Sequence, residues 1–417
     1  MAYDANSIKV RDFRTACRVS PGMYLGADGQ DATFNCFLEI LNNACDEAIM
    51  GRGDRIEIVI DDNSLSCTDH GAGIPYGPNN DCEEVLIELF TTSHSSGKFD
   101  QENYRKVRGL HGVGSSAVCV CSDKFEVWSR RGGAEHYLLF RDGIPQSQVS
   151  LKTKETDATG TTIKFTPSRE VFHIATDQPL FDIERIRNEL ELTSYFIPKV
   201  SFSLVSPTGG YTYRSENGLR DFAISRIKKP LHDTPLYAAK TFPGDIDIEI
   251  FAQWTAGKEK CYIFSNGALN SGGGTPEPGM KAAFTRTLNS LGGTNFDGDL
   301  IRRGLVTIIN IHHPSPIYQN QVKDKIQNAE LRGFTQTIFT DAIKEWARRH
   351  NDEFLKIVGI LKKETKAEEA AERARLAVLT QERRETEQKS KKIIMPTKFR
   401  DCEKHGMDSM LIVCEGN

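Results

Sequence analysis

The pattern of hydrophobic and polar positions predicts a helix followed by a hairpin near the start of the chain. Over residues 34–51 the apolar residues recur at intervals of three and four, which is typical of an amphipathic helix. Two apolar segments, residues 55–60 and 65–68, then indicate strands joined by the polar turn Asp61-Asp62-Asn63. The first 215 residues predict an α/β domain, with a further helix over 182–195 and further strands near residues 124–129, 136–141, 161–166 and 199–205.

The alternation of helices and strands continues beyond residue 215. A short helix over residues 217–227 is expected to end at Lys228-Lys229-Pro230, because proline cannot continue a helix. After it we expect a second group of elements, namely strands over 246–254 and 260–265, a glycine-rich loop at 271–275, a helix over 280–291 and an apolar strand over 305–311.

Residues from about 335 to 392 predict helix with few breakers. The stretch 361–392 is rich in Glu, Lys, Arg and Ala, a composition that favours a long exposed helix with charge pairs four residues apart. We interpret it as a solvated stalk rather than a DNA-binding surface. Pro396 then opens a short segment that ends in apolar residues followed by Glu415 and Gly416.

Composition and charge narrow the class of protein. A chain of 417 residues is too long for one core and predicts two or three domains. The formal net charge of −4 means that any contact with DNA depends on local basic surface. No apolar run approaches the ~20 residues of a membrane span, and no signal-peptide core is present at the start. The ten cysteines lack zinc-type spacing, so we expect buried thiols rather than a metal site or disulfides.

The first predicted helix carries a stripe of acids and an amide. Glu39, Asn43, Asp46 and Glu47 are three and four residues apart, which places them on roughly one face. A carboxylate and an amide stacked on a helix can position a water molecule and hold Mg²⁺, a cation that prefers oxygen ligands. An acidic helix face taken alone is more often simply solvated.

A second motif follows the predicted hairpin. The run Asp69-x-Gly71-x-Gly73-Ile74-Pro75 puts an acid at a strand end and spaced glycines after it. Such a carboxylate can bond to the edge of a base while glycine backbone lies close beneath the ring.

A third motif is the glycine-rich run over residues 108–117, which leads into an apolar, helical-looking stretch at 117–120. Backbone N–H groups at a helix start form an anion site. The nearby pair Gly97-Lys98 is not a Walker A motif, because Phe99 occupies the position of the required Ser or Thr.

The three motifs in this order resemble the Bergerat-fold ATP site of the GHKL superfamily, which includes gyrase, chaperones, histidine kinases and MutL. More specifically, the chain is similar to the B subunit of bacterial type IIA topoisomerases, either gyrase B or its topoisomerase IV counterpart. The segments that carry this similarity are PGMYLG at 21–26, SGKFD at 96–100, GLHGVG at 109–114 and QVKDKI at 321–326.

The resemblance extends over nearly the whole chain and implies an α/β (α+β) fold with four parts. These are an N-terminal arm (1–20), a GHKL ATPase domain (21–215), a ribosomal-protein-like βαβ transducer domain with a long C-terminal helix (216–394), and the start of a TOPRIM domain (395–417). Without the rest of TOPRIM, Glu415 cannot form a DNA-cleavage site.

The resemblance also implies roles for individual residues. Glu39 matches the general base, Asn43 matches the Mg²⁺ ligand, and Gln321 and Lys323 match transducer residues that reach the γ-phosphate. Asp69 matches the acceptor for the adenine amino group. Other residues expected at the nucleotide are Tyr3 of the arm, Asp46, Gly73, Ile74, Pro75, Thr161, the lid residues Lys98 and Tyr104, and the phosphate-facing run Gly109, Leu110, His111, Gly112, Val113 and Gly114.

The chain departs from the family pattern at several positions. Ala72 stands where the family has an arginine, so a salt bridge from that position to Glu47 is lost and coumarin sensitivity is not implied. Pro276 replaces a histidine and Arg303 replaces a glutamate. These changes leave the predicted ATP-site residues intact and indicate a divergent member of phage or plasmid type.

The implied function is an ATP-operated gate. Two chains would dimerise on binding ATP and Mg²⁺, capture a segment of double-stranded DNA, and reopen after hydrolysis. The implied partner in the full enzyme is an A-type subunit, and the implied place of action is the bacterial cytoplasm or nucleoid, for a host or a phage-encoded protein, without membrane contact.

Two alternatives stay open at the level of sequence. One is another GHKL clamp, MutL-like or chaperone-like, against which the Gln321-x-Lys323 motif and the TOPRIM-like end argue. The other is a nucleotide-binding module without significant turnover, against which the presence of Glu39 argues.

Overall fold

The computed structural model describes residues 11–93, 113–153, 155–320 and 323–391, together with residues 406, 407, 410 and 412. The chain forms two compact units, Met1–Ile357 and Val358–Asn417. The first unit holds the two sheets described below, and most of the described part of the second unit is helical.

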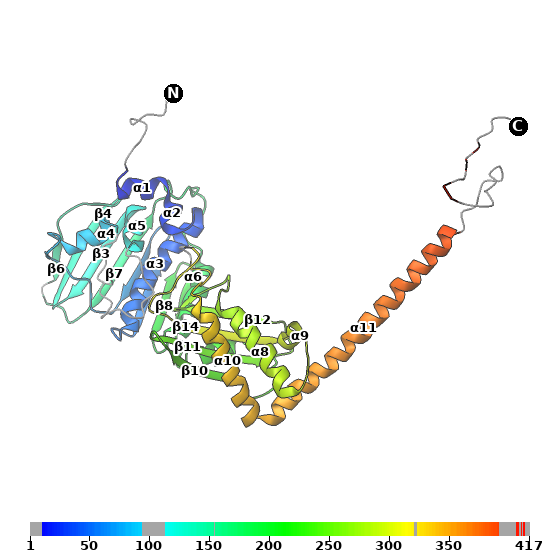
Figure 1. Cartoon of the computed structure of the whole chain (residues 1–417). Helices are drawn as coiled ribbons and strands as arrows, with labels where there is room; N and C mark the ends of the chain where they lie inside the picture. The colour runs from blue at the N-terminus through cyan, green and yellow to red at the C-terminus, as the bar shows by residue number, and fades with distance from the viewer. Residues whose placement is uncertain are drawn as a thin grey trace. The chain divides into compact units, whose positions relative to one another are not determined.

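The first domain is a sheet with helices α3, α4 and α5 on one face (Figure 1). Within the described residues its strand order is β5-β4-β3-β7-β2-β1-β8-β9, with β6 paired to β4. The strands are β1 (Arg55–Ile60), β2 (Leu65–Asp69), β3 (Ser122–Arg131), β4 (Ala134–Arg141), β5 (Ile144–Pro145), β6 (Ser150–Thr153), β7 (Gly160–Pro167), β8 (Ser201–Ser206) and β9 (Gly209–Tyr213). The helices are α1 (Phe13–Val19), α2 (Pro21–Leu25), α3 (Gly29–Ile49), α4 (Val85–Thr91), α5 (Gly114–Val120) and α6 (Ile183–Phe196).

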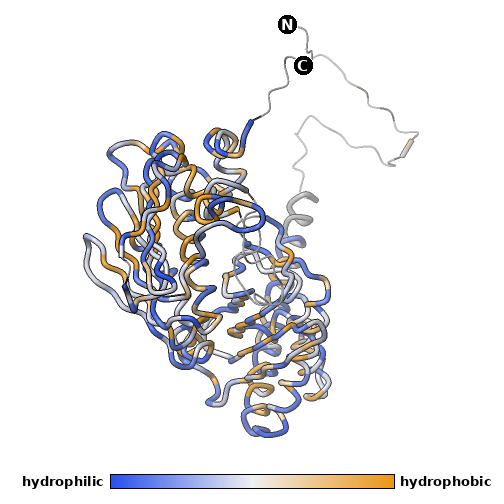
Figure 2. The backbone as a smooth tube through the Cα atoms, turned by 90° about the vertical axis from the view of Figure 1, so that its left-hand side faces the viewer, coloured by the Kyte–Doolittle hydropathy of each residue, from blue (hydrophilic) through white to orange (hydrophobic). Residues whose placement is uncertain are grey.

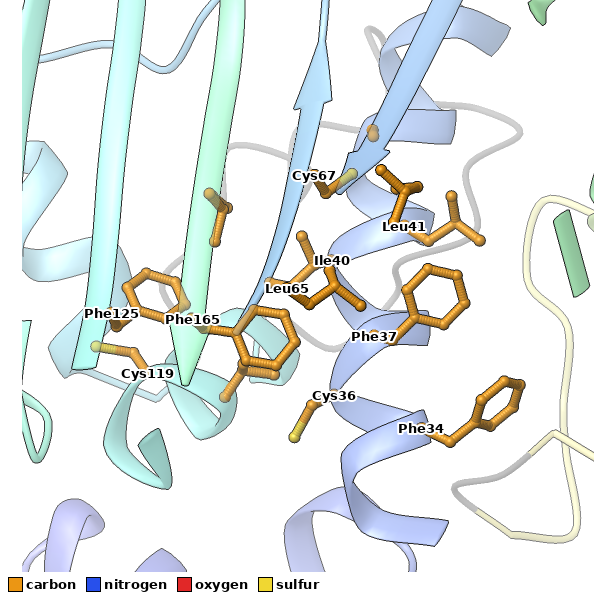
Figure 3. Close-up of a cluster of buried hydrophobic side chains, with 14 of the residues drawn as sticks. Phe34, Cys36, Phe37, Ile40, Leu41, Leu65, Cys67, Cys119, Phe125 and Phe165 are labelled. Carbon is orange, nitrogen blue, oxygen red and sulfur yellow. The ribbon is translucent and has the colours of Figure 1, made fainter. Parts of the chain in front are cut away.

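Helix α3 lies against the middle of this sheet. Asp28 caps its N-terminus by accepting from the Gly29 backbone N–H at 2.8 Å. Figure 3 shows Ile40 beside Leu65 of β2, while Phe34 points away from the sheet. The apolar spacing predicted from the sequence is therefore the buried face of this helix.

Residues 13–19, which lie within the predicted N-terminal arm, form α1, and Cys17 of this helix is fully buried in the core of the first domain. Asp12 caps this helix through the Thr15 N–H, and Arg18 Nη1 donates to the Val120 carbonyl at 3.0 Å. The sequence signal was weak because the helix is short and buries few large apolar side chains.

The second domain confirms the predicted βαβ architecture. Its five-stranded sheet has the order β10-β11-β14-β12-β13 within the described chain, and β12 and β14 run parallel on either side of a helical crossover. The strands are β10 (Leu236–Phe242), β11 (Ile246–Trp254), β12 (Lys260–Ser265), β13 (Ala268–Leu269) and β14 (Leu305–His312). The helices are α7 (Leu219–Arg226), α8 (Pro276–Gly292), α9 (Gly298–Arg302) and α10 (Glu330–Arg349). Helix α8 starts earlier than predicted because Pro276 fits the first turn of a helix.

The predicted C-terminal helix is divided in two. Helix α10 ends before His350, and α11 spans Asn351–Lys391. Residues 366–383 of α11 are exposed, and Arg373 pairs with Glu369 one turn away at 3.3 Å. No helix among the described residues is long and apolar enough to cross a membrane.

An aromatic cluster joins the two domains within the first unit. Phe196 of α6 and Phe222 of α7 pack against Phe264 of β12, with ring centroids 3.8 Å and 5.3 Å from the last ring. Hydrophobic residues follow the buried strands, whereas the connecting loops are largely hydrophilic (Figure 2). Helix α6 thus contributes both to the core of the first domain and to this cluster.

Replacing Phe222 with alanine should lower the free energy of unfolding by about 3–5 kcal/mol, because the lost ring leaves a cavity among four neighbouring aromatic rings. Urea denaturation followed by tryptophan fluorescence measures the loss. Ile224→Ala on the same helix is the control, since Ile224 is 75% exposed and should cost less than about 0.5 kcal/mol. Equal losses for the two variants would contradict the role of the cluster.

Candidate functional site

Asp69 and Thr161 meet at one point of the sheet. Asp69 is the last residue of β2, and Thr161 lies near the start of β7, which pairs with β2. The Oδ1 atom of Asp69 accepts from the backbone N–H of Gly71 at 2.8 Å and of Thr161 at 3.1 Å. Both residues are buried, so the structure brings together two residues that the sequence separates widely.

Burial controls the ionisation of Asp69. Removal from water raises the pKa of this carboxyl to about 6, and the nearby Glu47 adds to the rise. The two backbone N–H donors act in the opposite direction because they stabilise the charged form. The carboxylate is thus ionised at neutral pH but close to protonation, and a donor at its second oxygen would stabilise the charge.

The segment after Asp69 is fixed against β3. Gly73 has a φ of 75°, and a Cβ there would lie 2.3 Å from the Arg130 carbonyl oxygen, so only glycine fits. Arg131 Nη1 donates to the Gly73 carbonyl at 3.0 Å, and Ser129 Oγ donates to the Ile74 carbonyl at 2.6 Å. Sequence reasoning missed these β3 residues, because only the sheet order places β3 beside this loop.

Beyond Ile74 the chain turns outward. Pro75 is exposed, and the next residue, Tyr76, stacks on His136 of β4 with ring centroids 3.5 Å apart. The aromatic pair ties the loop to the strand beyond β3. Neither residue was singled out from the sequence, since no motif links them.

Glu47 has partners despite the alanine at position 72. Its Oε2 accepts from the Ala72 backbone N–H at 3.1 Å and lies 3.5 Å from Arg52 Nη1. The ion pair that an arginine at position 72 would have made is therefore replaced by one from the end of α3. Asp46, on the same helix, is fully buried.

The other end of the α3 stripe meets the start of α5. A Cβ on Gly114 would lie only 1.9 Å from Glu39 Oε2, so the glycine allows the carboxylate to approach the backbone there. One turn further along α3, Asn43 Nδ2 donates to Ser115 Oγ at 2.7 Å. Gly114 and Ser115, at the start of α5, thus lie beside Glu39 and Asn43 of α3.

Glu39 and Lys323 line the same cavity of about 540 Å³. Lys323 belongs to the loop between β14 and α10, in the second domain. The cavity wall also includes Phe34 and Arg185, whose guanidinium lies 3.9 Å from the Phe34 ring centroid. The structure therefore brings Glu39 of the first domain and Lys323 of the second domain to one cavity.

Some predicted residues lie outside the described part of the chain. They are Tyr3, Lys98, Tyr104, Gly109, Leu110, His111, Gly112, Gln321 and Glu415. Among the described residues, no group of three His, Cys, Asp or Glu side chains could hold a metal ion.

Two families match the two domains separately. Residues 29–171 match the histidine kinase-, DNA gyrase B- and HSP90-like ATPases, and residues 218–377 match DNA gyrase B. The chain is 31% identical over its full length to the DNA gyrase B proteins of Streptococcus pneumoniae and Halalkalibacterium halodurans, covering 65% and 66% of their lengths. The chain thus spans about two thirds of the length of these relatives.

Solved structures share the fold. The 43K ATPase domain of Thermus thermophilus gyrase B, solved with an aminocoumarin, aligns with a TM-score of 0.71 at 23% identity, covering 87% of this chain and 98% of that one. The topoisomerase IV ATP-binding domain of Francisella tularensis, solved with a small-molecule inhibitor, aligns with a TM-score of 0.67 at 23% identity, covering 84% and 95%.

The two family matches follow the order of the two domains along the chain. The chain belongs to the gyrase B family of type IIA DNA topoisomerases.

Proposed function

We propose that this chain binds and hydrolyses ATP as the N-terminal gate of a type IIA DNA topoisomerase. The observation that carries the proposal is the shared cavity of Glu39 and Lys323, which joins a potential base to a potential phosphate ligand. The Asp69–Thr161 contact supports the same proposal, since it offers a carboxylate for an adenine base on the same domain.

Base recognition would rest on Asp69. Its Oδ1 is occupied by two backbone N–H groups, so Oδ2 is the oxygen that would accept from the adenine amino group. Thr161 would add a hydroxyl from β7, and Gly73 would keep the loop close to the ring. Where adenine carries its amino group guanine carries a carbonyl oxygen, which an ionised carboxylate cannot bond, so a contact at that position would favour adenine over guanine.

Hydrolysis would rest on Glu39. Its carboxylate would orient a water molecule and take its proton as the water attacks the γ-phosphate. Residues Val113 and Gly114, beside Glu39, would begin the phosphate-binding wall. This arrangement separates base recognition by β2 and β7 from chemistry at α3 and α5.

Lys323 would connect the second domain to the reaction. A lysine amine is a compact positive charge that can stabilise negative charge developing on a transferred phosphoryl group. The contact would exist only while the γ-phosphate is present, so its loss after hydrolysis would release the second domain. Gln321 would act beside it.

Mg²⁺ would be held by Asn43 and the ATP phosphates. The Asn43 Nδ2 donates to Ser115, which directs the amide so that Oδ1 is the metal-binding atom. When bound, the ion would neutralise phosphate charge.

The wider function follows from the family. Two chains would close on binding ATP, with Tyr3 of each arm reaching the partner's nucleotide, and would trap double-stranded DNA. Contacts with DNA would be electrostatic and sensitive to salt. An A-type subunit would complete the enzyme in the bacterial cytoplasm.

Glu39→Ala should lower the ATP hydrolysis rate by about 10²–10⁴-fold, because the general base is removed, while affinity for a non-hydrolysable ATP analogue stays within about threefold. A coupled phosphate-release assay and calorimetry measure the two quantities. Glu184→Gln, an exposed glutamate of α6, is the control and should hydrolyse ATP like the wild type. Equal slow rates in wild type and Glu39→Ala would instead support a binding module without turnover.

ADP affinity should weaken as the pH falls through about 6. Bonding to adenine requires the ionised form of Asp69, which predominates above its pKa of about 6 and is lost below it. At pH 5 about a tenth of the carboxyl is ionised, so the dissociation constant should rise about tenfold. Calorimetry between pH 5 and 7.5 measures this change. In the Asp69→Asn variant, ADP affinity should change with pH only through the titration of the nucleotide itself. Parallel pH profiles of ADP affinity for the wild type and Asp69→Asn would argue against this role of Asp69.

The ATPase rate should rise faster than linearly with protein concentration, because closure of the gate requires a second chain. Size-exclusion chromatography with a non-hydrolysable analogue should show dimers, and Tyr3→Ala should reduce the dimer fraction. A linear rate with permanent monomers would leave an ATPase but remove the gate.

A further inference from the structure

The loop that carries Lys323 is a narrow hairpin. Its arms are joined by backbone bonds from Gln319 N to Lys325 O at 3.0 Å and from Gln327 N to Ile317 O at 2.8 Å. A bridge between Tyr318 and Ile326 lies between them. Lys323 is therefore near the tip, held by bonds along both arms.

The glycine-rich segment after β13 packs against this hairpin and supports it. Gly272 N donates to Asp324 O at 2.9 Å, and Gly274 forms a bridge with Ile326. A Cβ on Gly274 would lie 2.1 Å from the Ile326 carbonyl oxygen, so the close approach requires glycine. The glycine-rich segment thus supports the loop of Lys323, a role that the sequence alone did not reveal.

Asn270, just before the glycine-rich segment, bonds directly to Lys323. Its side chain is buried, with 3% of the residue exposed, and its Nδ2 donates to the Lys323 carbonyl at 2.6 Å. Its Oδ1 accepts from Ser265 Oγ at 2.7 Å. Ser265 Oγ also lies 3.1 Å from the Tyr318 hydroxyl, within hydrogen-bond distance. Asn270 and Ser265 together thereby connect Lys323 and Tyr318 of the loop to the end of β12.

The backbone of Lys323 needs such a support. Its φ of 60° lies in the left-handed region, which is unfavourable for a residue with a side chain. Such conformations persist where surrounding bonds impose them. The Asn270 amide holds the carbonyl of this very residue, and the Lys323 N–H donates to Asn320 O at 3.2 Å.

We propose that Asn270 is a positioning residue for ATP hydrolysis, which holds the Lys323 backbone so that its amine enters the cavity shared with Glu39. This inference rests on the proposed ATPase function. Asn270 follows the β12–β13 hairpin, and β12 pairs with β14 at the centre of the second sheet. A shift of that sheet would therefore move Lys323 relative to the nucleotide.

The test compares Asn270→Asp and Asn270→Ala with the wild type. The aspartate keeps the shape and the oxygen that Ser265 bonds, but it lacks the N–H donor and places negative charge against the Lys323 carbonyl. Both variants should lower kcat for ATP about ten- to hundredfold, because Lys323 is displaced from the transition state. ADP has no γ-phosphate, so its dissociation constant should stay within about twofold.

Two controls separate positioning from general destabilisation. Asn289→Ala removes a comparable asparagine, whose Nδ2 donates to the Phe296 carbonyl at 3.0 Å on the far side of α8, and should lower the melting temperature without lowering kcat. In a Lys323→Ala background, assayed by single-turnover hydrolysis, Asn270→Ala should cause little further loss, since it acts through that lysine.

The outcomes are distinguishable. The positioning role would be overturned if Asn270→Asp had the kcat of the wild type. It would also be overturned if Asn270→Ala lowered the hydrolysis rate in the Lys323→Ala background as much as it does in the wild type. Neither result would affect the proposed hydrolysis of ATP by the wild type. If the Asn270 variants do not fold, Ser265→Ala is the second variant, because it removes the hydroxyl that contacts both Asn270 and Tyr318 of this network. It should show the same fall in kcat at unchanged ADP affinity, and unchanged kcat there would overturn the inference. Absence of Glu39-dependent hydrolysis in the wild type would instead refute the proposed function.

Discussion

The burial of one face of α3 against the central sheet is the constraint on which the candidate site depends. Because Ile40, Leu41 and Ala44 are held in the core, the helix cannot rotate, and its polar stripe must face the start of α5. The absence of a side chain at Gly114 then lets the Glu39 carboxylate approach that backbone. The position of the proposed base is thus a result of hydrophobic packing rather than of polar contacts around it.

In the second domain, as in the first, apolar packing and polar contacts have separate roles in shaping the candidate site. The aromatic rings of Phe196, Phe222 and Phe264 join the domains, while a network of buried amides and backbone bonds shapes the Lys323 loop. Buried polar groups have to be bonded, and such networks define one geometry better than apolar contacts do. Apolar packing therefore sets where the domains meet, and the amide network sets where the lysine lies.

Asp69 shows the cost and the use of burying a charge. Two backbone N–H groups favour the charged form, but burial outweighs them and the pKa stays raised. A donor on the base would stabilise the charged form further. In the proposed function, recognition of the base would thus offset part of the cost of burying this carboxylate.

The sequence by itself determined the class of fold and most element positions, and it indicated the candidate site residues, because hydrophobic period and short motifs are local properties. The sequence pattern predicts the periodic face of α3, the acid that ends β2 and the βαβ arrangement. Local signals were too weak for α1, which buries few large side chains, and for the early start of α8 at Pro276. Only the tertiary structure decided that Arg52 pairs with Glu47, that β3 supports the loop of Gly73, and that Asn270 holds Lys323. These contacts join residues from different elements, and their geometry follows from sheet order and packing, which no local pattern encodes.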